Sequence, residues 1–147
     1  MVILHMCCTL LSYAAFLLAF VSGALFLIQE WQVKHKRMGR LFHGLPALGT
    51  LDRVNFVALG VGFGLLSLGL LCGFVGARRV FGQWWTRDAK ALVAVVMWGG
   101  YLAVWQLRLR ATVRGRKVAV LSMLGFTLVL ATVFGARYWL PSWHRFL

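Results

Sequence analysis

Residues 54–77 read VNFVALGVGFGLLSLGLLCGFVGA, and this stretch decides the fold because it contains no Asp, Glu, Lys or Arg. A helix of about 20 apolar residues spans the hydrocarbon core of a bilayer. Glycines recur in the stretch four residues apart, as Gly60 and Gly64 and again as Gly69 and Gly73. Because small residues at this spacing let helix backbones approach closely, the stretch predicts a membrane helix that packs tightly against another helix.

Three further apolar runs without charged residues flank this stretch. They cover residues 2–28, 91–107 and 118–136. Hydrophobic residues make up 61% of the 147-residue chain and the mean hydropathy is +0.81, both well above the values of a soluble domain. The runs are continuously apolar, whereas membrane strands alternate. We therefore predict an all-α integral membrane bundle of four transmembrane helices, forming a single domain over residues 1–147.

The net charge of +13 lies almost entirely between the apolar runs and predicts the topology. Ten Lys and Arg residues fall in the breaks after the first and third runs, and six fall in the second break and the tail. The positive-inside rule then places the first and third loops in the cytoplasm and both termini outside. Short basic loops beside a bilayer meet anionic lipid headgroups, so we predict membrane lipids and no nucleic acid as partners.

The first apolar run has a polar face and is followed by a polar connector. Its polar and small residues follow helical spacing and should share a face that points into the bundle: His5, Thr9, Ser12, Tyr13, Phe16 and Gly23. The run is too long for the core of a cleavable signal peptide, so we expect it to stay in the membrane. Residues 29–53 form an amphipathic connector that should lie along the cytoplasmic surface. Cys7, Cys8 and Cys72 form no C-x-x-C pair, which argues against covalent haem attachment and thiol redox chemistry.

A tryptophan-rich loop over residues 78–90 separates the second and third runs and is expected to face outward. It combines aromatic rings with charges: Arg78, Arg79, Trp84, Trp85, Arg87 and Asp88. Indole faces stack on flat conjugated rings, and arginine forks suit carboxylates. Haem is a ligand of this kind, with its two propionates. The same residue types also collect at membrane interfaces as an aromatic belt with anchoring charges, and that interpretation stays open.

Two histidines fall on the same predicted outer face as this loop. His5 lies at the outer end of the first helix, and His144 lies beyond the fourth. Two imidazoles are able to ligate haem iron from opposite sides. The alternative is that His5 is a hydrogen-bonded helix-end residue and His144 a solvated tail residue.

Several segments resemble those of one known family. Residues 5–14 match a pattern H-x(6)-S-Y-A, residues 62–70 read GFGLLSLGL against G-F-x-L-L-T-L-G-L, and residues 81–88 read FGQWWTRD against W-G-x-x-W-x-W-D. Residues 45–53, 114–117 and 140–144 continue the likeness. The chain thus resembles the C-terminal part of the CcsA/ResC cytochrome c assembly proteins, within the haem-handling superfamily that includes CcmC, CcmF and HemX-like proteins.

The resemblance implies haem as cofactor, with His5 and His144 as its axial ligands. Trp84 and Trp85 would pack on the macrocycle, whereas Asp88 would orient a neighbouring arginine. The propionates would be held by arginines: Arg78, Arg79 or Arg87. It further implies a bacterial inner (cytoplasmic) membrane or its equivalent, an apocytochrome c client, other membrane subunits, and at most a part in the machinery that forms haem thioether bonds.

Departures from the family pattern support a second hypothesis. Phe81 and Arg87 replace two tryptophans of the motif, and Gln106 stands where the family has a transmembrane histidine. These changes favour a non-catalytic scaffold or regulatory membrane subunit of a larger complex that has lost haem. They also predict that any haem lies at the outer surface rather than at the bilayer centre. A transporter is disfavoured, because the spans carry no acidic relay.

Overall fold

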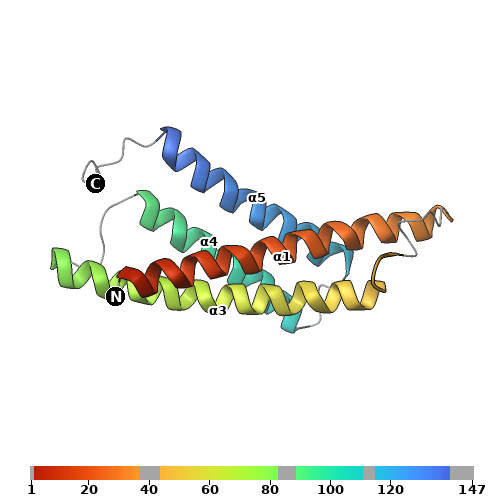
Figure 1. Cartoon of the computed structure of the whole chain (residues 1–147), viewed down its shortest axis with the longest axis horizontal. Helices are drawn as coiled ribbons and strands as arrows, with labels where there is room; N and C mark the ends of the chain where they lie inside the picture. The colour runs from red at the N-terminus through yellow and green to blue at the C-terminus, as the bar shows by residue number, and fades with distance from the viewer. Residues whose placement is uncertain (1, 37–43, 83–88, 111–114, 140–147) are drawn as a thin grey trace.

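The computed structural model describes residues 2–36, 44–82, 89–110 and 115–139 (Figure 1). These residues form four helices and no strand: α1 (Val2–Lys34), α3 (Leu48–Phe81), α4 (Ala89–Leu109) and α5 (Arg116–Trp139). Within the described part, α1, residues 48–80 of α3 and residues 92–109 of α4 are long and apolar enough to cross a membrane. The predicted all-α bundle of four helices is confirmed, and its N-out/C-out orientation stays a prediction.

The helices extend beyond the apolar runs, which corrects two predictions. α1 continues to Lys34 and α3 already begins at Leu48, so much of the connector expected along the surface belongs to the ends of these helices. Lys34 donates to Glu30 one turn earlier at 2.9 Å, a spacing that supports a helix. The tryptophan-rich loop is shorter than residues 78–90, because α3 runs through Arg78 and Arg79 to Phe81.

Gly82 explains where α3 ends. Its φ is 69°, in the left-handed region, and its N–H donates to the Arg78 carbonyl. Glycine adopts this conformation without a steric penalty, which is why it commonly follows the last helical turn. The residues between Gly82 and Ala89, which carry most of the predicted ligand loop, lie outside the described part of the chain.

The glycine-rich helix α3 packs mainly against α1. A Cβ added at Gly62 would lie 2.7 Å from the Phe16 ring, and one at Gly69 would lie 3.0 Å from Thr9 Cγ2. The close packing predicted from Gly69 and Gly73 is confirmed. The other predicted pair is divided: Gly60 faces the Trp105 ring of α4, whereas a Cβ at Gly64 would meet nothing within 4 Å. The prediction for Gly64 was wrong because, one turn beyond the contact of Gly60 with Trp105, no neighbouring atom lies within 4 Å of a Cβ at that position.

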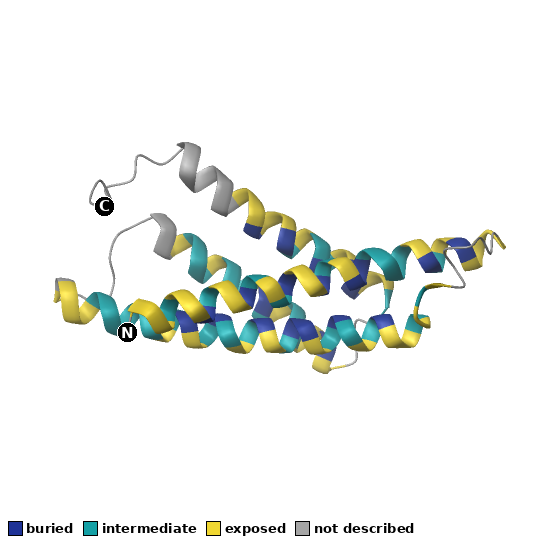
Figure 2. Ribbon diagram, in the orientation of Figure 1, coloured by how far each residue is buried: buried dark blue, intermediate teal, exposed yellow. Residues whose placement is uncertain are grey.

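The polar face predicted for α1 points into the bundle. Ser12, Phe16 and Ala19 are at most 1% exposed, and Figure 2 shows the buried residues gathered where the helices meet. The Phe16 ring stacks on Tyr101 of α4, with centroids 3.8 Å apart. Large apolar side chains such as Leu10, Leu71 and Leu124 are more than half exposed, as expected of surfaces that face lipid.

Hydrogen bonds between helices add to this packing. Asn55 Nδ2 of α3 donates to the Ala19 carbonyl of α1 at 2.7 Å and to Ser122 Oγ of α5 at 3.0 Å. Trp98 Nε1 of α4 donates to Ser67 Oγ of α3 at 2.8 Å. Polar side chains that pair across helices stabilise membrane bundles, and these two sets connect all four helices.

Candidate functional site

His5 is held against α3 by one short hydrogen bond. Its Nδ1 lies 2.7 Å from the Gly69 carbonyl oxygen. A carbonyl oxygen only accepts, so Nδ1 carries a proton, and in the neutral ring Nε2 keeps its lone pair. A backbone carbonyl on one ring nitrogen is also what fixes the tautomer of histidines that ligate metals. This hydrogen bond is compatible with both predicted roles of His5, a metal ligand through Nε2 and a hydrogen-bonded residue at a helix end.

The local sequence makes this hydrogen bond possible. A Cβ added at Gly73 would lie 3.2 Å from both His5 Cε1 and Nδ1, so a side chain at that position would crowd the ring. The Thr9 hydroxyl donates to the carbonyls of His5 and Met6, both at 2.9 Å. Because α1 and α3 run in opposite directions, His5 lies against Gly73 and Thr9 lies against Gly69. One helical turn separates the two residues of each pair in their own helix.

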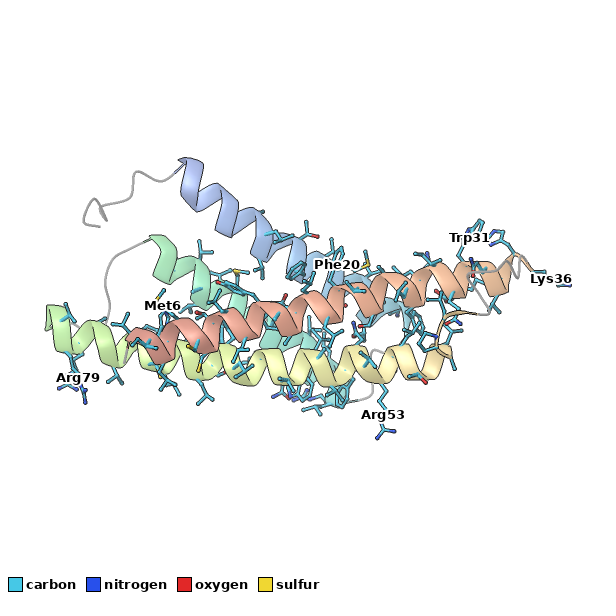
Figure 3. The ribbon with its side chains drawn as sticks, viewed as in Figure 1. Met6, Phe20, Trp31, Lys36, Arg53 and Arg79 are labelled. Carbon is cyan, nitrogen blue, oxygen red and sulfur yellow. The ribbon has the colours of Figure 1, made fainter. Side chains whose placement is uncertain are left out.

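Arg78 and Arg79 lie at the same end of the bundle as His5. Both are exposed in the last turn of α3, and Arg78 lies about 8 Å of helix rise beyond Gly73. Figure 3 shows Arg79 and Met6 toward one end of the molecule, with Trp31 and Lys36 at the other. Cations in a last turn also favour the helix itself, because they face the negative end of its dipole.

The other predicted site residues lie outside the described part of the chain: Trp84, Trp85, Arg87, Asp88 and His144. Whether His144 approaches His5 therefore stays a prediction. Gln106 is described, and its side chain is exposed on α4 rather than directed into the bundle. No three His, Cys, Asp or Glu side chains cluster among the described residues, and all three cysteines are free thiols.

The two described histidines cannot share one ligand. His5 is near the start of α1, and His35 directly follows its end, which separates them by about 45 Å along the helix. His35 Nδ1 contacts the Trp31 carbonyl oxygen at 2.9 Å, so its ring is held much as that of His5 is. His35 therefore offers a comparable imidazole at the wrong end of the bundle.

Sequence reasoning missed an ion pair at the opposite end of the bundle from His5. Arg108, which we had assigned to a loop, has a side chain only 7% exposed, and its Nη2 lies 2.8 Å from Asp52 Oδ2. Its guanidinium also lies 5.0 Å from the Phe56 ring centroid, and that ring stacks on Trp105 at 4.8 Å. Asp52 is one of only three acidic residues in the chain, and this scarcity was the signal that it had a specific partner.

Comparisons with known proteins agree with the sequence patterns. The sequence model of a family described as Cytochrome C assembly protein matches residues 1–144. A cytochrome c biogenesis protein CcsA of Prochlorococcus marinus strain AS9601 is 38% identical over 88 residues, which cover 60% of this chain and 28% of the relative. The protein of the same name from Guillardia theta is 27% identical over 158 residues, which cover 97% and 52%.

A third relative is also about twice as long as this chain. The cytochrome c biogenesis protein CcsA of Prochlorococcus marinus subsp. pastoris is 28% identical over 155 residues, covering 92% of this chain and 49% of the relative. The chain thus spans about half, or less, of the length of the curated relatives that it matches. No solved structure matches it significantly.

Proposed function

The chain belongs to the cytochrome c assembly protein family, and from this premise we propose that it binds or presents haem for cytochrome c assembly. The observation that carries the proposal is the hydrogen bond between His5 Nδ1 and the Gly69 carbonyl. In the neutral ring it leaves the Nε2 lone pair available, at the end of the bundle that carries Arg78 and Arg79. The relatives named CcsA are described as acting in cytochrome c biogenesis, and the span-forming helices make this chain an integral membrane protein.

The described residues fit haem in the type of donors that they offer. Imidazole is a common axial ligand of haem iron, and Arg78 and Arg79 carry the forked donors that suit propionates. When bound, haem supplies the vinyl groups to which thiols of an apocytochrome add. The protein's own contribution is to position and orient these groups.

We assign the remaining roles by position in the family pattern. His144 is the proposed second axial ligand, and Trp84 and Trp85 pack on the ring. Arg87 joins the propionate-binding arginines, and Asp88 orients one of them. The proposed partners are other membrane subunits and an apocytochrome c client, in a bacterial cytoplasmic membrane or its equivalent.

The geometry supports a site at the end of the bundle rather than at its centre. His5 is near the first turn of α1, and its ring contacts the region of Gly69 and Gly73, close to the final turns of α3. Gln106 lacks an imidazole and is exposed. A haem bound through His5 therefore lies near the end of the helices that carries Arg78 and Arg79.

Titration of haem into the purified chain tests the proposal directly. We expect the absorption spectrum of a histidine-ligated haem, with a shift on reduction, and we expect His5→Ala to abolish it. His35→Ala is the matched control, because it removes a similarly held imidazole from the opposite end and should leave the spectrum unchanged. Equal spectra for the two variants would show that His5 is not a ligand.

The second candidate function is a membrane scaffold or regulatory subunit without haem. It rests on Phe81 and Arg87 in place of motif tryptophans, and on the exposed Gln106. The same titration separates it from the first candidate. A chain that retains its helical content and takes up no haem would be the scaffold.

A further inference from the structure

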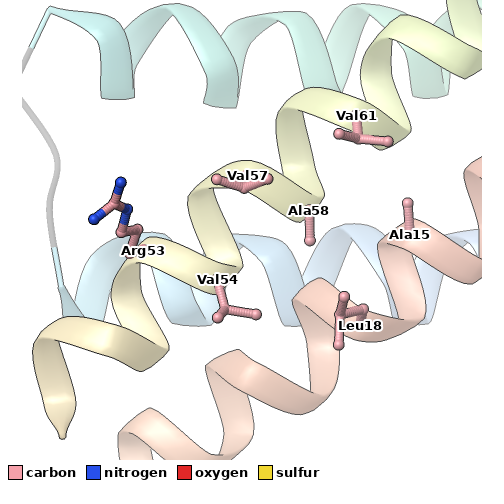
Figure 4. Close-up of a pocket in the computed structure, with 7 residues that line it drawn as sticks. All are labelled: Ala15, Leu18, Arg53, Val54, Val57, Ala58 and Val61. Atoms are coloured by element: carbon pink, nitrogen blue, oxygen red, sulfur yellow. The ribbon is translucent and has the colours of Figure 1, made fainter.

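A groove between α1 and α3 has no role in the proposed haem site. Its volume is about 350 Å³, and Figure 4 shows its lining: Ala15 and Leu18 of α1, and Arg53, Val54, Val57, Ala58 and Val61 of α3. Six of these seven side chains are apolar. The groove is open to the outside of the bundle, since Val57 and Val61 are 54% and 52% exposed.

Arg53 is the one charged residue among the seven described residues that line the groove, and it lies at one end of it (Figure 4). It directly precedes the apolar run that begins at Val54. The two described acidic residues are both engaged elsewhere, Glu30 with Lys34 and Asp52 with Arg108. Arg53 is exposed and has no carboxylate partner among the described residues.

The length of the groove from Arg53 to Val61 is close to the hydrocarbon thickness of one bilayer leaflet. From Arg53 to Val61 the helix rises by about 12 Å. One leaflet contributes about 15 Å of hydrocarbon. The charge therefore sits at headgroup level, while the apolar lining runs from there toward the middle of the membrane.

We propose that this groove binds an anionic glycerophospholipid, with its phosphate on Arg53 and one acyl chain along the valines of α3. Basic pockets between membrane helices are known to take anionic headgroups. The acyl chain meets the apolar side chains of both helices, and the phosphate receives the forked donors of the guanidinium. The bound lipid thus joins α1 to α3 at the opposite end of the bundle from His5.

Charge and size favour a lipid over a protein helix as the occupant. A helix segment 12 Å long and 10 Å wide has a volume of about 900 Å³, so the groove accepts side chains of a helix but not its backbone. A helix in the membrane would also have to supply a buried acid to Arg53, which is costly. An anionic lipid brings that charge at the correct depth.

Native mass spectrometry of the chain in detergent micelles tests the proposal with two lipids of identical acyl chains, phosphatidylglycerol and phosphatidylcholine. We expect phosphatidylglycerol to bind about fivefold more tightly, the factor for one basic residue near the headgroups, and Arg53→Gln to remove the difference. Lys117→Gln is the control. It deletes an exposed cation of α5 at the same end, where Gly115 lies against Phe26, and should keep the preference.

Two further measurements do not depend on the folding of the Arg53 variant. High salt should reduce the preference of the unmodified chain for phosphatidylglycerol, and Val61→Trp should weaken binding of both lipids by filling the groove. Equal binding of both lipids to the unmodified chain would overturn the proposal, as would equal losses in Arg53→Gln and Lys117→Gln. A dimer that Val61→Trp dissociates, with lipid binding unchanged, would identify a second protein copy as the occupant.

Discussion

Arg108 of α4 donates to both the carboxylate and the backbone carbonyl of Asp52 on α3, at 2.8 and 2.9 Å. The contact joins two helices whose remaining contacts are largely aromatic, through Trp98 and Trp105. It also neutralises a cation that we had counted as a free loop charge. Because the Arg108 side chain is 7% exposed, removal of its partner leaves a buried charge.

Asp52→Asn should destabilise the bundle by about 2 kcal/mol, the range for a hydrogen bond to a charged group. The cost stays below that of a fully buried pair because the Asp52 side chain is 30% exposed. The measurement is the unfolding midpoint in detergent. Glu30→Gln breaks the exposed pair with Lys34 and should cost about 0.5 kcal/mol or less. Equal losses would show that burial of Arg108 does not matter.

Gly69→Leu should loosen the packing of α1 on α3, because a Cβ alone would lie 3.0 Å from Thr9 Cγ2. Overpacking of this kind costs about 1–3 kcal/mol, which should lower the melting temperature in detergent. Gly64→Leu places the same side chain where a Cβ meets nothing within 4 Å. That variant should melt like the original chain, and a comparable drop in both would contradict the assigned interface.

Gly73→Ala should weaken haem binding without unfolding the chain. The new Cβ would lie 3.2 Å from His5 Nδ1, so the ring must move relative to the Gly69 carbonyl. Loss of such an orienting partner typically costs about 10–100-fold in affinity. Haem titration by absorbance measures the effect. Gly76→Ala, at a position where a Cβ meets nothing within 4 Å, should bind haem normally.

The topology has its own test. A tag fused after Leu147 should be accessible from the non-cytoplasmic side of the membrane, since the ten-to-six division of cations places both termini there. Even without Arg108 and Lys34, which pair with Asp52 and Glu30, eight cations stand against six, so the bias keeps its sign. A tag that is labelled only from the cytoplasmic side would reverse the orientation.

The four helices were predictable because each apolar run is long enough to impose one. The polar face of α1 was predictable as well, since His5, Ser12 and Phe16 follow a helical period. The ends of α1 and α3 were not predictable, because hydropathy indicates which residues lie in lipid and does not indicate where the helical backbone hydrogen bonds end. Gly82 marks that stop for α3 by a left-handed φ, which depends on local geometry.

The candidate site was only partly predictable for a related reason. The choice of His5 needed only a family pattern, but its tautomer depends on the carbonyl of Gly69, which is 64 residues away in the chain. The register between α1 and α3 decides which carbonyl that is. The ion pair between Asp52 and Arg108 was not predicted, because both residues were assigned to loops, where water can solvate a charge without a partner.

Helix α3 runs without a break over 34 residues, and both prolines of the chain lie outside it. It is therefore about 50 Å long, with Arg53 near one end, whereas the Gly69 carbonyl that holds His5 lies only about 7 Å beyond its midpoint. A tilt of about 5° around the midpoint displaces each end by about 2 Å but the Gly69 carbonyl by only about 0.6 Å, which stays within the range of hydrogen-bond distances. A tilt of α3 would thus displace Arg53 and the last-turn arginines further than it displaces the carbonyl that holds His5.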